Sequence, residues 1–481
     1  MFYIQIVFLK ILTLVFGLMF FLNQNILFAV CSGEMPILPS SFNENYIVGS
    51  LCSNLDSVQS SNNCMQEKKT FFKDILLIFK NNKNKSKKIC KNNEKYLEEA
   101  SIAFVRLKEI APPNITCLDL YALIMQVFEM KNKIKFKKNN NFFQTKVELA
   151  KNSFNITFFE NGNIYCMPDT HWKTGGENTI YSGFKIFPVD KIEEYVMSVP
   201  NKIRSINNKT NVNELLLIKL KLYKIFEMQK KIEKNNQGQL ALALAEDASI
   251  EKKKYATAIF SKKLMGNAYD IFKNNGIKDQ VVFKEEACRL VKALEHLQKY
   301  SEGLIHRDIK TQNILVDENK HSYIADFGLS TVVSDYIRES IGEIKGTEGM
   351  IAPEILMESL QTTALLRSFS SKVRAQKKLS IYKSDIFSLG LVFFYLKHGV
   401  DHPFIREHFV PLFKEITTKN SSIQDVINYI EKILTPSYEK LVNSLEVDSN
   451  NNQIDLTILK MINPDFNNRP GYVELIKFFC E

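Results

Sequence analysis

The spacing of apolar residues divides this chain of 481 residues into a helical first part and a mixed second part. Between residues 32 and 144, apolar side chains recur at three- and four-residue steps, which is the period of an amphipathic helix. Pro112 and Pro113 interrupt this pattern. From about residue 145 strands alternate with helices. We therefore expect a mostly helical segment that contains several cysteines over 32–144, followed by a folded domain over 145–481.

Within the second part, the pattern predicts the bounds of several elements. A helix over 282–300 carries one apolar stripe and ends before Gly303, and a helix over 384–396 is apolar on nearly every side, as in a buried core helix. The other expected elements are strands at 178–187, 239–245 and 254–260, a helix at 212–234, and the start of a second subdomain at 264–272.

The first thirty-one residues form a separate signal. After Lys10, residues 11–22 carry no charge, but a helix of about 12 residues spans only about 18 Å of a hydrocarbon core of about 30 Å. This favours a cleaved signal peptide over 1–31. The alternative is a signal anchor over 2–22 that stays in a membrane. Because positive charge precedes this segment and acidic residues follow it, the rest of the chain is expected outside the cytosol, in the secretory pathway. The cytoplasmic face of a membrane is the alternative.

Composition adds few constraints. The formal charge of +10 is spread through Lys- and Asn-rich runs that predict loops, so no nucleic-acid partner is expected. No CxxC pair occurs, which argues against a zinc site, and Cys288 in its helical pattern is expected to be a buried thiol. Two groups of residues suit a luminal chain, namely the early cysteines (Cys31, Cys52, Cys64, Cys90, Cys117) and the glycosylation sequons (Asn84, Asn114, Asn155, Asn208, Asn420).

Three sequence blocks carry the chemistry. They are HRDIKTQNILVD from His306, ADFGLS around Asp326, and GTEGMIAPE ending at Glu354. In this order and spacing they resemble the catalytic core of the eukaryotic protein kinase family. The resemblance implies an α+β, two-lobed fold, with a small β-rich N-lobe at about 145–262 and a larger helical C-lobe at about 263–481, preceded by the helical N-terminal segment.

The resemblance also implies roles for single residues. Asp308 is expected to be the catalytic base, Lys310 to neutralise charge on the transferred phosphoryl group, and Asn313 and Asp326 to hold magnesium. Lys185, in a predicted strand, is expected to bind the ATP phosphates and to pair with a helix glutamate. That glutamate is either Glu214 or Glu227, and the sequence does not decide between them.

Further residues would support this core in the family. Asp385 is expected to bind the backbone around His306 and Arg307, and Glu354 to form a buried ion pair with Arg469. Lys310 and Thr347 indicate serine/threonine specificity. Arg307 beside the base implies regulation by phosphate on the activation segment, for which the candidates are Thr331, Ser334, Tyr336 and Ser340.

Two features depart from the family pattern. The phosphate-covering glycine loop matches 149–156 or 160–166 only without its glycines, and a basic insertion, expected to be a loop rather than a docking surface, separates Glu354 from Asp385. The expected function is an ATP- and Mg²⁺-dependent serine/threonine protein kinase that acts on protein substrates, with possible anchoring through residues 2–22. The alternative is a pseudokinase or scaffold that binds nucleotide without efficient transfer. The sequence leaves the oligomeric state open.

Overall fold

The computed structural model of the chain describes most of the region after residue 132 and a few earlier positions. The described residues are 103, 107, 123, 124, 126, 127, 130, 131, 133–148, 153–174, 178–188, 192–204, 211–236, 240–300, 303–336, 345–360, 371–412, 414, 423–446 and 453–481. The predicted signal segment, the five early cysteines and the sequons other than Asn155 lie outside them. The chain divides into two compact units. One comprises residues up to 136 with 143–169 and 184–193, and the other comprises 137–142, 170–183 and 194–481.

The first unit is a set of antiparallel strands packed with helical residues. β2 pairs with β3, and β3 with the second half of β5; the strands are β1 (Phe142–Glu148), β2 (Ser153–Phe159), β3 (Ile164–Pro168) and β5 (Asn178–Phe187). One apolar cluster joins Ala103, Leu107 and Ile124 to strand residues such as Phe154 and Ile186. The boundary expected at residue 145 is therefore not a boundary between two cores, because residues on both sides of it share this cluster.

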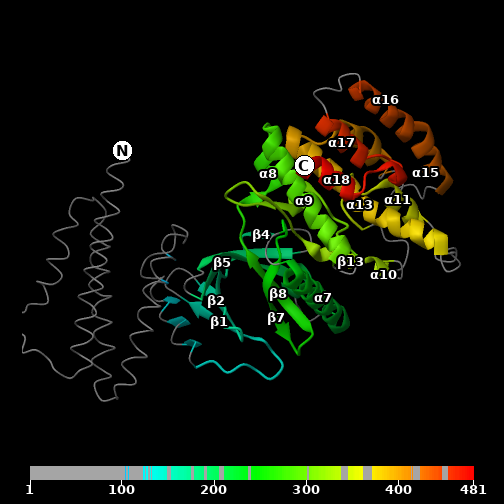
Figure 1. The fold of residues 1–481 in the computed structure, drawn as a ribbon. Helices are drawn as coiled ribbons and strands as arrows, with labels where there is room; N and C mark the ends of the chain where they lie inside the picture. Colours follow the sequence, from blue (N-terminus) through cyan, green and yellow to red (C-terminus); the bar gives the residue numbers. More distant parts are fainter. Residues whose placement is uncertain are drawn as a thin grey trace, which may run out of the picture. The chain divides into compact units, whose positions relative to one another are not determined.

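The second unit begins with the other half of the strand-rich region. Its strand order is β5-β6-β8-β7, with β4 paired to β5. Helix α7 packs on β7 and β8 (Figure 1). The elements are β4 (Lys173–Thr174), β6 (Glu193–Pro200), α6 (Asn201–Arg204), α7 (Val212–Asn236), β7 (Ala245–Glu251) and β8 (Tyr255–Lys262). The strand-rich region followed by helices confirms the predicted α+β class.

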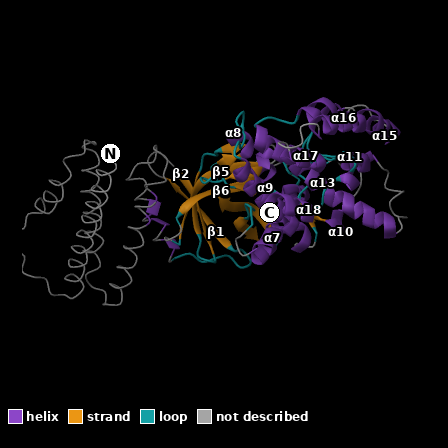
Figure 2. Cartoon of the chain, turned by 45° about the horizontal axis from the view of Figure 1, so that its top comes forward, coloured by secondary structure: helices purple, strands orange, loops and turns teal. Residues whose placement is uncertain are grey.

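The rest of the second unit is mostly helical. Helices α9, α13, α17 and α18 gather around one core (Figure 2). The elements are β9 (Gly266–Asn267), α8 (Ala268–Phe272), α9 (Gln280–Tyr300), β10 (Leu304–Ile305), η2 (Thr311–Asn313), β11 (Ile314–Val316), β12 (Ser322–Ile324), η3 (Phe327–Leu329), β13 (Thr331–Val332), α10 (Val333–Tyr336), α11 (Pro353–Leu360), α13 (Ser371–His398), η4 (Ile405–Phe409), α15 (Ile423–Tyr429), η5 (Ile430–Leu434), α16 (Thr435–Glu446), α17 (Gln453–Met461), η6 (Phe466–Asn468) and α18 (Tyr472–Cys480).

Helix α13 confirms one prediction and corrects another. Its apolar second half is buried, as the all-round apolar pattern predicted, and Leu379–His398 is long and apolar enough to cross a membrane by composition alone. Because 78% of that window is buried inside the protein, it is a core helix. The helix begins at Ser371, however, so the later half of the basic insertion is helical and not a loop.

The predicted strand at 239–245 is wrong in position. β7 begins only at Ala245, and the preceding residues pair instead with the end of β12: Ala243 N donates to Ile324 O at 2.8 Å, and Ile324 N donates to Ala241 O at 2.9 Å. The apolar alternation of this segment reflects burial of Ala241 and Leu242 in the core of the helical region. It does not reflect membership of the sheet.

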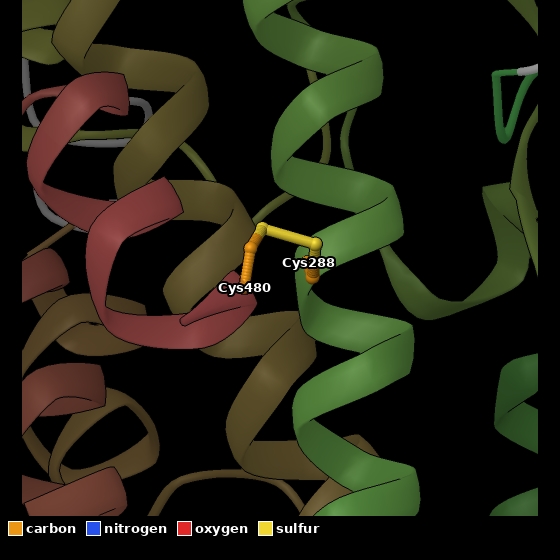
Figure 3. The surroundings of a disulfide bond; sticks show 2 residues. All are labelled: Cys288 and Cys480. Carbon is orange, nitrogen blue, oxygen red and sulfur yellow. A yellow bond between two sulfur atoms is a disulfide. The ribbon is translucent and has the colours of Figure 1, made fainter.

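Cys288 is also placed differently from the prediction. It forms a disulfide bond with Cys480, which joins α9 to the last turn of α18, with a Cα–Cα distance of 5.1 Å (Figure 3). The sequence pattern showed that Cys288 lies on a helix but gave no information on a partner 192 residues away. Among the described residues the free cysteine is Cys166, buried in the first unit, and burial raises the pKa of its thiol.

Candidate functional site

The residues of the first motif meet around one carboxylate, that of Asp308. Lys310 Nζ lies 2.8 Å from Asp308 Oδ2, and Asn313 Nδ2 donates to the same oxygen at 2.9 Å. Thr347 Oγ1 donates to Asp308 Oδ1 at 2.7 Å and accepts from Lys310 Nζ at 2.8 Å. Asp308 and Asn313 are both buried. The carboxylate is thereby fixed in orientation by three side chains, which is the preorganisation that a catalytic base requires.

Asp326 is brought to this group by a backbone link. The β11–β12 hairpin returns the chain toward Asn313, and Ala325 N donates to Asn313 O at 2.8 Å. Asp326 follows directly, in the left-handed conformation with φ of 62°, and its Oδ1 accepts from Gly328 N at 3.1 Å. Its side chain is exposed, in contrast to those of its neighbours. The structure therefore places the two carboxylates expected to act together on adjoining segments.

His306 joins the two motifs. The ring is fully buried, its Nε2 lies 3.1 Å from Ala325 O, and it packs on the ring of Phe327. Burial lowers the pKa of His306, although the negative charges of Asp385, Asp326 and Asp308 oppose that shift. The buried ring holds the segment of Asp308 against that of Asp326. No role for the His306 side chain is predicted from the sequence, although its position in the first motif is visible there.

Asp385 binds the backbone of the segment around His306 and Arg307, as predicted. Its Oδ2 accepts from His306 N at 2.7 Å and its Oδ1 from Arg307 N at 2.9 Å. Burial raises the pKa of this carboxyl group, and the two backbone donors, together with the charges of His306 and Arg307, oppose that shift. The hydrogen bonds explain why an acidic residue is retained inside an otherwise apolar helix.

The predicted ion pair at the base of the lobe is present. Arg469 donates in bidentate fashion to Glu354, at 2.6 and 2.8 Å, and further donors of Arg469 reach the carbonyls of Asn463 and Lys383. Both side chains are buried. Removing one partner would leave the other charge uncompensated, which destabilises proteins by about 3–5 kcal/mol. The pair joins the start of α11, which carries Glu354, to the residue that follows η6, Arg469.

Arg307, which the sequence links to phosphate-dependent regulation, is half-buried. Its Nε donates to Leu329 O at 2.7 Å, and it lines a pocket together with Lys345, Ile351 and Ser384. Of the candidate phosphorylation sites, Ser334 is exposed and Thr331 is buried. Ser340 and the side chain of Tyr336 lie outside the part of the chain that the structure describes.

Lys185 lies on the strand predicted at 178–187, which is β5, but β5 is not the strand that leads into α7. The lysine is buried on β5, opposite Tyr165 of β3, and belongs to the first unit, whereas Asp308 and Asp326 belong to the second. The strand that leads into α6 and α7 is β6, which contains no lysine. β6 pairs with β8, and Ser198 is paired with Ile259. Of the two candidate glutamates, Glu214 forms an exposed ion pair with Lys202, and Glu227 is exposed on α7. The partner of Lys185 stays a prediction.

The strand pairing indicates a hairpin of β4 and β5 that is not among the elements predicted from the sequence. β4 pairs with the start of β5 through Lys173 and Ile180, and through Thr174 and Thr179. The residues between them are Gly175, Gly176 and Glu177, outside the described residues. The two loops proposed from the sequence adjoin β2 in the first unit, and neither contains glycines at the required positions. The Gly-Gly pair between β4 and β5 is the feature of the sequence from which this hairpin could have been predicted.

Known proteins match the same part of the chain. The family model described as "Protein kinase domain" matches residues 200–478. Serine/threonine-protein kinase 32B of Homo sapiens is 48% identical over 68 residues, which cover 14% of this chain and 16% of that protein. Serine/threonine-protein kinase 32C of Mus musculus is 27% identical over 182 residues, 35% of this chain and 34% of that protein. Phytosulfokine receptor 1 of Arabidopsis thaliana is 36% identical over 89 residues, 18% of this chain and 7% of that protein. The chain thus spans about a third or less of the length of these relatives.

Proposed function

Because this chain belongs to the protein kinase family, we propose that it is a serine/threonine protein kinase, which transfers the γ-phosphate of ATP to hydroxyl groups of protein substrates. The observation that carries the proposal is the set of hydrogen bonds that orients Asp308. Lys310, Asn313 and Thr347 all contact its carboxylate. A scaffold without transfer activity would not require this carboxylate to be held so closely.

In the proposed reaction Asp308 orients the acceptor hydroxyl and receives its proton. The hydroxyl oxygen forms the new bond to phosphorus, and the bond between the γ-phosphorus and the bridging oxygen breaks, so that ADP leaves with the electron pair. Lys310, which lies between Asp308 and Thr347, offsets the negative charge that collects on the transferred group. Serine/threonine specificity is supported by Lys310 and Thr347, since both belong to this hydrogen-bonded group.

The residues present fit magnesium. Asp326 offers an exposed carboxylate, and Asn313 donates through its amide nitrogen to Asp308, which leaves the amide oxygen oriented as an acceptor. Oxygen donors of this kind are the ligands that Mg²⁺ prefers. Bound there, the ion would neutralise charge on the nucleotide phosphates. Asp326 and Asn313 would hold the ion. The Asp326 carboxylate is oriented by the hydrogen bond that its Oδ1 accepts from Gly328 N.

Two further assignments belong to this proposal. Lys185 is the proposed phosphate-binding lysine on the basis of the resemblance of its sequence context, GFKIF, to the lysine-bearing strand of the family. The segment between β4 and β5 is the proposed phosphate-covering loop, because its sequence contains the pair Gly175 and Gly176, and glycine is the residue type that lets backbone N–H groups approach phosphate closely. The lack of a lysine on β6 is the observation that favours the alternative, a nucleotide-binding scaffold.

We further propose that the domain acts in the secretory pathway or outside the cell. The disulfide bond between Cys288 and Cys480 supports this, because such bonds persist in oxidising compartments. The predicted signal segment points in the same direction. The substrates would then be secreted or membrane-exposed proteins.

The decisive experiment compares the full-length chain with Asp308→Asn in transfer of labelled γ-phosphate to a serine- and threonine-containing peptide library. We expect transfer to fall at least about a hundredfold, the usual contribution of a general base, with binding of a fluorescent ATP analogue kept. Asp279→Asn is the matched control, since its side chain only accepts from the N–H groups that begin α9. Nucleotide binding without transfer by the unaltered chain would support the scaffold instead.

A further inference from the structure

Residues 137–142 make a set of hydrogen bonds to the hairpin of β7 and β8. Asn141 N donates to Ile250 O at 3.3 Å, and Lys253 N donates to Asn139 O at 2.9 Å. The side chain of Asn141 accepts from Ile250 N at 2.8 Å and donates to Ala248 O at 3.0 Å. Both flanking segments belong to the first unit, while 137–142 belongs to the second. A run of asparagines expected to be a plain loop therefore has defined contacts, and we call it the asparagine clamp.

The clamp lies where the hairpin is irregular. β7 is the last strand of its sheet, so one of its edges has no strand partner within the described part of the chain. The register between β7 and β8 shifts between Ala248 and Ile250, which leaves Ser249 as an irregular residue. Asn141 binds on both sides of that shift with one amide group. Its side chain supplies the donor and the acceptor that a neighbouring strand would otherwise provide.

The turn beside the irregularity is strained. Lys252 and Lys253 both have left-handed backbones, with φ of 50° and 61°, in a turn where asparagine and glycine are the usual residues. This backbone conformation is unfavourable for a residue with a side chain, so it persists only if its surroundings hold it. Lys252 N donates to Asn140 Oδ1 at 3.2 Å, and Lys253 N donates to Asn139 O. The asparagine clamp supplies both of these acceptors.

The hairpin in turn fixes helix α7. Phe226 of α7 packs with Ala245, Ala248 and Ile259 of the two strands, and Gln229 Oε1 accepts from Ala245 N at 2.7 Å. Near the turn, Lys219 forms an ion pair with Glu251 at 2.8 Å. A change in the register of β7 would therefore be passed to α7 at both ends of the strand.

Helix α7 reaches the segment that carries Asp326. It contacts η3, which starts at the residue after Asp326, and Ile232 of α7 belongs to the same core cluster as Phe327. The path from Asn141 to the proposed magnesium ligand thus consists of packed elements within one unit. Coupling of this kind is passed through contiguous packing.

We propose that Asn141 is a positioning residue for the kinase reaction, which acts through β7 and α7 on the placement of Asp326. The proposal rests on the proposed function. If the proposal is right, replacing Asn141 raises the concentrations of nucleotide and Mg²⁺ that the reaction requires. This rise should be larger than the one caused by a substitution elsewhere that lowers stability by the same amount.

The test uses full-length Asn141→Ala and Asn141→Asp. We expect the Mg²⁺ concentration for half-maximal phosphate transfer to rise at least threefold in both, and the amides of residues 245–251 to exchange hydrogen faster. Asn141→Asp keeps the size of the side chain and the acceptor for Ile250 N but loses the donor to Ala248 O, so an effect of packing alone would spare it. Asn161→Ala is the control, because Asn161 Oδ1 likewise accepts a turn amide, that of Asn163.

An unchanged magnesium requirement in both Asn141 variants, with exchange faster or not, would overturn the proposal and leave at most a structural role. If neither variant folds, Asn140→Ala, which removes only the bond to Lys252 N, takes their place under the same criteria. Absence of transfer by the unaltered chain would refute the proposed function but not the clamp. In that case binding of Mg²⁺ with a fluorescent ATP analogue replaces transfer as the readout.

Discussion

Asp385 and Arg307 show how single residues hold the catalytic loop. Arg307 has a left-handed backbone, with φ of 67°, which is unfavourable for a residue with a long side chain. The two hydrogen bonds from the backbone of His306 and Arg307 to the buried carboxylate of Asp385 compensate for it. Strain at this position is therefore balanced by a residue 78 positions away in the sequence.

A second residue-scale effect concerns the buried His402. Burial lowers its pKa to about 4, and the positive charge of His398 contributes while Asp455 opposes. A histidine whose pKa is lower in the folded than in the unfolded state takes up protons on unfolding. Its contribution to stability is therefore complete above about pH 6.5 and is lost as the pH falls toward 4.

We predict that His402→Asn reduces this pH dependence. Asn can still accept from Phe404 N, which donates to His402 Nδ1 at 3.2 Å, but it does not titrate. Between pH 7 and 4 the unfolding free energy of the unaltered protein should fall by up to about 3 kcal/mol more than that of the variant. Denaturant titrations at several pH values measure this difference. Equal pH slopes in the two proteins would contradict the assignment.

At the scale of elements, the helices α9 and α18 act as one covalently joined pair. α9 leads into the catalytic loop, and its apolar stripe packs in the core that contains Leu475 and Phe479 of α18. The disulfide bond between Cys288 and Cys480 fixes the last turn of the chain to this helix (Figure 3). Fraying of the terminal helix, common at chain ends, is thereby restricted.

We predict that reduction of this bond destabilises the domain by about 2–4 kcal/mol, because the bond closes a long loop in the unfolded chain. Thermal unfolding with and without dithiothreitol measures the effect. A variant with both Cys288→Ser and Cys480→Ser should unfold at the lower temperature in either condition and show no response to the reductant. Equal unfolding temperatures for the oxidised protein and this variant would exclude a stabilising role.

At the scale of the whole molecule, the main question is the compartment. The disulfide bond between Cys288 and Cys480 and the predicted signal segment both favour an oxidising environment. A secreted chain would be processed near residue 32 and modified at its sequons.

We therefore predict that the protein isolated from its native cells begins near residue 32 and migrates faster after glycosidase treatment. N-terminal sequencing and gel mobility measure both properties. Asn155 is expected to be the least modified sequon, because it lies in β2 and its Nδ2 donates to Asp169 at 3.0 Å. Retention of residues 2–22 with added glycans would indicate a membrane anchor, and an intact N-terminus without glycans would contradict secretion.

Much of the candidate site followed from local sequence. Asp308, Lys310 and Asn313 lie within six residues, and the β11–β12 hairpin that returns Asp326 has a strand pattern and a turn that are visible in the sequence. The periodicity of α7, α9 and the buried half of α13 was likewise sufficient to predict them. These features depend on residues close together in the chain, where spacing translates directly into geometry.

The sequence by itself determined the kinase motifs, the helical and strand-rich regions and the pairings of Asp385 and Arg469. Only the tertiary structure decided that β6 and not β5 leads to α7, that Cys288 bonds to Cys480, and that Asn141 supports β7. Each of these depends on which distant segments become neighbours. A strand, a cysteine or an asparagine has the same local pattern whichever partner it meets, so the choice is made only when the whole chain packs.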